Sequence, residues 1–99
     1  MIDIDTLLAW GGVFKKIKAG EIIFQEGVHS PLYYQLVEGK VRWVNINEQG
    51  KEFIQILIEP GECFGEFALF DDGPFAATAI ADEDSVIIRL HKDSFYDIL

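Results

Sequence analysis

Hydrophobic and polar residues alternate in short runs along most of the chain, which is the pattern of half-buried β-strands. Gly, Pro, Asn or Asp residues separate each run from the next. The predicted strands are 20–25, 33–38, 40–46, 52–58, 76–81 and 85–90. Many short strands with turn signals between them are typical of a closed sandwich or barrel. The pattern therefore predicts a mainly β fold, a jelly-roll β-barrel (double-stranded β-helix) with short flanking helices.

Two short helices are expected at the ends of this strand region. Residues 3–10 predict a helix that places Leu7 and Leu8 on one face. Residues 92–99 have the pattern of the first turns of a second helix. The lysine-rich segment 15–18 predicts a solvated turn or a strand edge rather than a nucleic-acid-binding patch.

Alternation also predicts which side chains face the interior. In one strand, Val41 and Trp43 alternate with Arg42 and Val44. The apolar choice places Val41 and Trp43 inside the barrel, with the other two residues outside. The same reasoning indicates outward faces for both arginines of the chain, Arg42 and Arg89.

Composition limits the functions that are open to this chain. Its 99 residues, 49% of them hydrophobic, suffice for a single domain with one core. The 8 basic and 17 acidic residues give a net charge of −9, which repels phosphate backbones. We therefore expect no nucleic-acid binding by this segment itself. Cys63, the only cysteine, is expected to be a small buried hydrophobe rather than part of a disulfide or an iron–sulfur cluster.

Several other classes of protein lack support in the sequence. No apolar run approaches transmembrane length, and the acidic start at 1–5 is unlike a signal peptide, so we expect a cytoplasmic protein with no membrane partner. A cupin-type metalloenzyme would use two histidines separated by one residue, whereas this chain has only His29 and His91. We expect no metal site and no enzymatic activity.

Residues 64–78 carry the most specific pattern of the chain. They read F-G-E-F-A-L-F-D-D-G-P-F-A-A-T. This run closely resembles the phosphate-binding cassette of cyclic-nucleotide-binding domains, which reads F-G-E-[L/F]-A-L, a short loop and then P-R-A-A-T. A glycine lets the backbone approach an anion, and the N–H groups of a following helical turn favour negative charge. The resemblance implies a ligand-binding cassette made of Gly65, Glu66, Phe67, Phe75, Ala76 and Ala77, in which Glu66 would accept a hydrogen bond from the ribose hydroxyl.

Phe75 occupies the position where the family has an arginine that binds the cyclic phosphate. Loss of one partner from a buried charge pair costs about 2–5 kcal/mol, which is roughly one and a half to three and a half decades of affinity. We therefore expect weak or no binding of cyclic AMP or cyclic GMP, and no other cofactor. Val41 and Trp43 are expected to line the pocket. Trp43 and Phe75 either fill a site that no longer binds a ligand or form an apolar pocket for a less charged effector.

The segments 20–27 and 34–41 resemble the recurring patterns G-x-x-[I/L]-x-x-x-G and Y-x-[I/V]-x-x-G-x-V of CRP/FNR-type transcription regulators. Residues 15–99 as a whole are similar to the sensor domain of that family. The resemblance implies that 1–99 is a single sensor domain, that a small-molecule effector binds it, and that DNA is bound only by a C-terminal domain absent from this chain. It also implies a homodimer in the full-length form. Kinase regulatory subunits and ion channels carry the same module and stay the alternative, although the short stretch before the strands favours a bacterial regulator.

Overall fold

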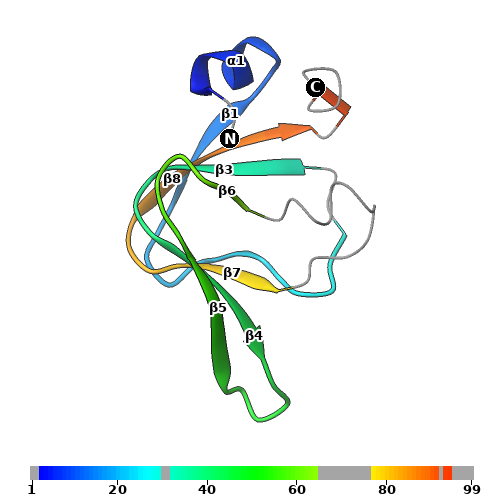
Figure 1. Ribbon diagram of the computed structural model, residues 1–99, viewed down its shortest axis with the longest axis vertical. Helices are drawn as coiled ribbons and strands as arrows, with labels where there is room; N and C mark the ends of the chain where they lie inside the picture. Colours follow the sequence, from blue (N-terminus) through cyan, green and yellow to red (C-terminus); the bar gives the residue numbers. More distant parts are fainter. Residues whose placement is uncertain (1–2, 30–31, 65–76, 92, 95–99) are drawn as a thin grey trace.

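The computed structural model describes residues 3–29, 32–64, 77–91 and 93–94. These residues form one short helix and two antiparallel sheets (Figure 1). In the first sheet the strand order is β1-β8-β3-β6, and in the second sheet it is β2-β7-β4-β5. The bounds are α1 Ile4–Ala9, β1 Val13–Ile17, β2 Ile22–Phe24, β3 Leu32–Glu38, β4 Val41–Ile46, β5 Glu52–Ile58, β6 Cys63–Phe64, β7 Thr78–Ala81 and β8 Ser85–His91.

The strand order is that of a jelly roll, in which two four-stranded sheets pack face to face over one core. The predicted mainly β, jelly-roll architecture is therefore confirmed. The predicted closure into a barrel is wrong, because no ladder of hydrogen bonds joins the two sheets within the described strands. The edge strands explain this result: β2 has 3 residues and β6 has 2, so neither is long enough to bridge the sheets.

Each predicted strand corresponds to an observed one with its ends shifted by at most two residues, as in 76–81, where β7 begins at Thr78. Two observed strands were not predicted, Val13–Ile17 and Cys63–Phe64. The first is a lysine-bearing edge strand that pairs only with β8, and the second is too short to show an alternating run. Most of the segment 15–18 lies in this edge strand, as predicted.

Helix α1 begins after Asp3, whose carboxylate accepts a hydrogen bond at 3.3 Å from the backbone N–H three residues later. Leu7 is fully buried against the outer face of the first sheet, whereas Leu8 is 39% exposed. The prediction that both leucines share a face is wrong, because successive residues on a helix are about 100° apart. Of the predicted helix 92–99, the structure describes only residues 93–94, which are helical.

Strand β4 faces the core with the side chains that the alternation predicted. Val41 is 0% exposed and Trp43 is 9% exposed, and both belong to the cluster between the sheets. Arg42 faces outward, as predicted, and it forms ion pairs on that side of the sheet. Val44 was expected on the solvent side but is fully buried. The opposite residue on β7, Thr78, is buried as well, and its hydroxyl accepts a hydrogen bond at 2.9 Å from the backbone N–H two residues after β2, so the segment after β2 covers this part of the outer face.

Candidate functional site

The strands on either side of the predicted cassette meet in the core between the sheets. Strand β6 ends at Phe64, and Ala77 directly precedes β7; both residues belong to the buried cluster. The remaining predicted cassette residues lie outside the described residues, so their role in ligand binding stays a prediction: Gly65, Glu66, Phe67, Phe75 and Ala76.

The structure brings the two predicted pocket residues, Val41 and Trp43, into one buried cluster with Ala77. Strand β4 supplies the first two residues and pairs with β7, which follows the cassette. Trp43 lies opposite Ala79, whose small side chain leaves space for the indole. These residues are therefore packed beside the end of the cassette, while their contact with a ligand stays a prediction.

Four aromatic rings fill the interior next to this position, and Phe24 contacts the other three. Its ring centroid lies 5.3 Å from that of Tyr34, 5.8 Å from that of Phe64 and 6.3 Å from that of Trp43. Such separations are typical of attractive aromatic pairs. Phe24 was not singled out in the sequence, because a short apolar run does not reveal which of its residues meets other rings in the core.

Trp43 has an indole N–H that is available for a hydrogen bond. In the part of the chain that the structure describes, its Nε1 atom is buried and has no acceptor. A buried donor without a partner typically costs about 1–3 kcal/mol. Among the described residues the indole N–H of Trp43 is therefore an unsatisfied donor in the core.

Arg89 lies on the inner face of the first sheet, which corrects the predicted outward orientation. It is two residues from Ile87 of the inner core, and its cross-strand partner Tyr34 pairs in turn with Phe64. Alternation misled the prediction because both faces of β8 are covered: Ile87 and Ile88 are each fully buried. The Nε atom of Arg89 is buried and, among the described residues, has no hydrogen-bond partner.

Arg42 has a different environment, outside the second sheet. Its Nε donates to Glu52 at 2.9 Å, and its second terminal nitrogen donates to the same carboxylate at 3.3 Å. The guanidinium also forms an ion pair with Asp82. These hydrogen bonds, first that to Glu52 and then that to Asp82, raise the pKa of Arg42 above its ordinary value. The guanidinium therefore ties β4 to β5 and to the turn after β7, which leaves it poorly placed to bind a ligand.

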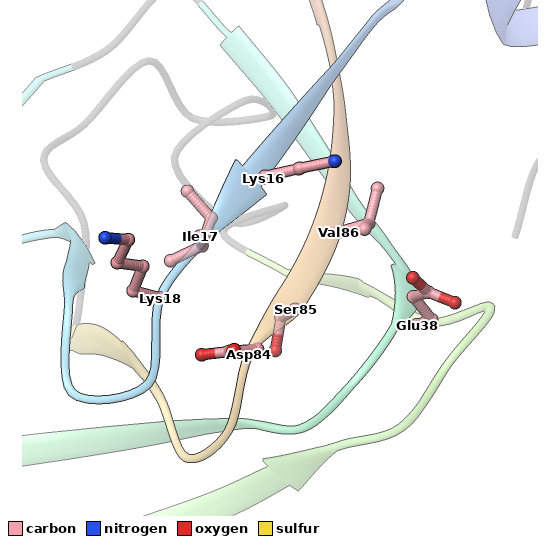
Figure 2. Close-up of a pocket in the computed structure, with 7 residues that line it drawn as sticks. All are labelled: Lys16, Ile17, Lys18, Glu38, Asp84, Ser85 and Val86. Carbon is pink, nitrogen blue, oxygen red and sulfur yellow. The ribbon is translucent and has the colours of Figure 1, made fainter.

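A surface hollow of about 280 Å³ lies where β1, β3 and β8 come together at one end of the first sheet (Figure 2). Lys16 and Lys18 line it together with Glu38 and Asp84, so its charges balance. Figure 2 shows Lys16 extending across β8, whereas Lys18 points to the opposite side. Asp84 already accepts a hydrogen bond from the backbone N–H of Ala19 at 2.9 Å. We attribute this hollow to the shape of the turn rather than to ligand binding.

Within the described ranges, no group of three or more His, Cys, Asp or Glu side chains is placed to hold a metal ion. His29 and His91 are both exposed and lie in different parts of the chain. Cys63 is half-buried and packs against the cluster beneath α1 rather than being fully buried as expected. The described helices also include none with the length and apolar character needed to cross a membrane.

Comparison with known proteins identifies the same family by two routes, a family model and a similar sequence. Residues 14–99 match the family model described as the cyclic nucleotide-binding domain. Over 80 residues the chain is 34% identical to the cyclic AMP receptor protein of Thermus thermophilus, which corresponds to 81% of this chain and 37% of that protein. The chain therefore spans well under half the length of this curated relative.

Solved structures of two kinds of regulator share the fold. The sensor domain of the transcriptional regulator DNR from Pseudomonas aeruginosa superposes with a TM-score of 0.82 at 25% identity, over 93% of this chain and 61% of that one. The regulatory domain of Toxoplasma gondii PKA, crystallised with cAMP, superposes with a TM-score of 0.85 at 27% identity, over 99% and 38% of the two chains.

Proposed function

Because the chain belongs to the cyclic nucleotide-binding domain family, we propose that it is the ligand-sensing regulatory domain of a CRP/FNR-like transcription regulator. The likeness to the Thermus cyclic AMP receptor protein and to the DNR sensor domain supports this proposal. In this view residues 1–99 are the sensor domain alone and catalyse no reaction. DNA binding belongs to a further domain that this chain does not contain.

The observation that carries the proposal for the ligand is Phe75, which stands where the family cassette has an arginine. A phenyl ring cannot donate the charge-assisted fork that a guanidinium gives to a phosphate. Arg42 offers no replacement, because Glu52 and Asp82 already hold it outside the second sheet. We therefore propose that cyclic AMP and cyclic GMP bind this domain weakly or not at all, and that its effector is another small molecule.

Isothermal titration with cyclic AMP and cyclic GMP tests the proposal for the ligand. The unmodified protein should give no saturable heat at micromolar nucleotide, whereas Phe75→Arg should gain roughly 30- to 3,000-fold in affinity, which corresponds to about 2–5 kcal/mol. The matched control Phe75→Leu changes the side chain without adding charge and should not gain affinity. Micromolar binding by the unmodified protein would contradict the proposal.

If the Phe75→Arg variant also fails to bind a cyclic nucleotide, Trp43 is the next residue to test. The indole is buried beside the described end of the cassette and is much larger than a valine side chain. Trp43→Val in the Phe75→Arg background should then restore binding by opening space for the purine. If the double variant folds and still does not bind, the cassette backbone itself is unsuited to a cyclic nucleotide.

The proposed homodimer has some support from the hairpin of β4 and β5, which projects from the body of the domain (Figure 1). Phe53 and Ile56 on this hairpin are each at least 50% exposed and share one face, because they pair with residues two apart on β4. Exposed apolar side chains that lie close together commonly mark sites of association. Sedimentation of the full-length protein, compared with a Phe53→Lys variant, would show whether the hairpin contributes to a dimer.

The alternative is the regulatory module of another signalling protein. The observation that favours it is the likeness to the Toxoplasma PKA regulatory domain, which extends over 99% of this chain. The two proposals predict different segments after residue 99 in the coding sequence. A basic helix-turn-helix would support the transcription regulator, and a channel or kinase-anchoring segment would support the alternative.

A further inference from the structure

A small cavity lies between the two sheets on the side where both end in an edge strand, β1 in the first sheet and β2 in the second. Its volume is about 50 Å³, roughly that of one to two water molecules and therefore of a single small polar group. Tyr34, Ile17, Ile23 and Ile87 line it. Three charged residues also line it: Lys15, Glu21 and Arg89.

Arg89, which is partly buried, contributes a positive charge to the lining of this cavity. A guanidinium stays protonated in proteins, and the described residues supply no acceptor for its buried Nε. A desolvated cation is unfavourable unless an anion or a set of acceptors compensates for the lost water. The described lining therefore leaves the Nε–H of Arg89 without the acceptor that it requires.

Lys15 adds a second positive charge on the same face. It pairs with Ile87 on β8, two residues from Arg89, so the two cations project from adjacent strands toward the same side. Glu21 is the only acidic lining residue, and within the described part of the chain no ion pair joins it to either cation. Two cations and one carboxylate leave the cavity with a net charge of +1.

We propose that this cavity binds the oxyanion group of a small molecule, either a carboxylate or a phosphate, with Arg89 as the main anchor. Nε and a terminal nitrogen of a guanidinium donate in parallel to two oxygens of such a group. Lys15 contributes a longer-range attraction from the edge strand, and Glu21 opposes it.

The described lining of this site includes none of the described residues that flank the cassette. Its described lining comes from β1, β2, β3, β8 and the turn that joins β1 to β2, and it includes neither Phe64, Ala77 nor Thr78. The inference therefore does not depend on whether a cyclic nucleotide binds. The titrations with Phe75→Arg test the cassette, and anion titrations test Arg89, so each proposal can fail while the other stands.

The most direct test is a titration of the ¹⁵N-labelled chain with inorganic phosphate, and separately with acetate, followed through the arginine Nε–H signals. The chain has only two arginines, and Arg42 is the internal control because Glu52 already occupies its Nε. We expect a saturable shift of the Arg89 signal and little change for Arg42. Sodium chloride at matched ionic strength should not reproduce the shift. The anion that gives the stronger response identifies the class of ligand.

Charge variants then test the geometry through the anion affinity. Arg89→Gln should lower the affinity roughly tenfold or more, followed through the backbone signals of the cavity, and Lys15→Gln should lower it several-fold. Lys16→Gln removes the same charge from the opposite face of β1 and is the matched control, with no change expected. Glu21→Gln should raise the affinity, because it removes the like charge.

Three results would overturn the site. The first is an Arg89 signal that follows ionic strength without saturation. The second is equal loss of affinity in Lys15→Gln and Lys16→Gln, which would indicate general attraction to the edge strand. The third is unchanged affinity in a folded Arg89→Gln variant. If Arg89→Gln does not fold, the exposed positions Lys15 and Glu21 still decide the outcome through the opposite signs of their effects.

Discussion

The two arginines of this chain differ in what surrounds them, although each occurs among alternating apolar residues. Arg42 donates to Glu52 and is paired with Asp82 on the outside of the second sheet. Arg89 faces the first sheet's inner side with a buried Nε for which the described residues provide no acceptor. One guanidinium therefore stabilises the connection between strands, while the other is available to a bound anion.

Arg42→Gln should lower the free energy of unfolding by roughly 1 kcal/mol. The effect is modest because the Arg42 side chain is 23% exposed and that of Glu52 is 38% exposed, so solvent screens the pairs, which are typically worth about 0–1 kcal/mol each. Urea unfolding measures the change, with Lys16→Gln as the control that removes one charge outside these ion pairs. A loss of less than about 0.3 kcal/mol would show that the ion pairs add no net stability.

The direction in which pH changes the stabilisation by Arg42 follows from its pKa shift. Because hydrogen bonds to Glu52 and Asp82 raise the pKa of Arg42 in the folded state, the folded protein holds this proton more tightly than the unfolded chain does. The contribution is therefore fully present below the ordinary pKa of arginine and is lost only as the pH rises through the folded value. The difference in the free energy of unfolding between the unmodified protein and Arg42→Gln should thus be the same at pH 7 and pH 9.

The turn between β3 and β4 depends on a close contact with the start of β8. Gly39 has a φ of 101°, a conformation that side chains other than glycine rarely adopt. The hydroxyl of Ser85 lies next to it and accepts a hydrogen bond from the N–H of Lys40 at 3.2 Å. A Cβ atom on Gly39 would lie 2.2 Å from the Ser85 oxygen. The glycine therefore permits both the turn and its contact with β8.

Gly39→Ala should consequently destabilise the domain more than an alanine at a comparable open glycine. Gly20 is the matched control, since its φ is 85° and no atom lies within 4 Å of an added Cβ. Backbone strain should cost each variant about 1–2 kcal/mol, and the clash with Ser85 should cost Gly39→Ala at least about 1 kcal/mol more. Thermal and urea unfolding of both variants measure the difference. Equal effects would show that Ser85 moves aside without loss.

The strand pattern predicted the positions of the strands well, but it predicted less well which strand faces are buried. Runs such as 52–58 and 85–90 were located because alternation and turn residues are local properties. Alternation cannot show which face of a strand is covered by another element. For that reason Val44 was expected to be exposed but is buried on the outer face of β4, and Arg89 was expected outside although it faces the core on β8, where both faces are covered.

The charge of the whole molecule leads to the prediction for DNA. A net charge of −9 on 99 residues disfavours contact with phosphate backbones. The isolated chain should therefore show no binding to duplex DNA by fluorescence anisotropy, even at low salt, where such binding is strongest. A full-length protein that contains a DNA-binding domain is the positive control. Tight binding by residues 1–99 alone that weakens with salt would contradict this expectation.

The amino-acid sequence by itself determined the family and the mainly β class of this protein. The cassette pattern 64–78, the strand spacing and the replacement at Phe75 are local in sequence, so they can be read without coordinates. Only the tertiary structure decided that the sheets stay open as two layers, that Phe24 joins three other rings, and that Arg89 and Lys15 line one cavity. These features depend on pairing between strands that are distant along the chain, and no local pattern of residues encodes which of them become neighbours.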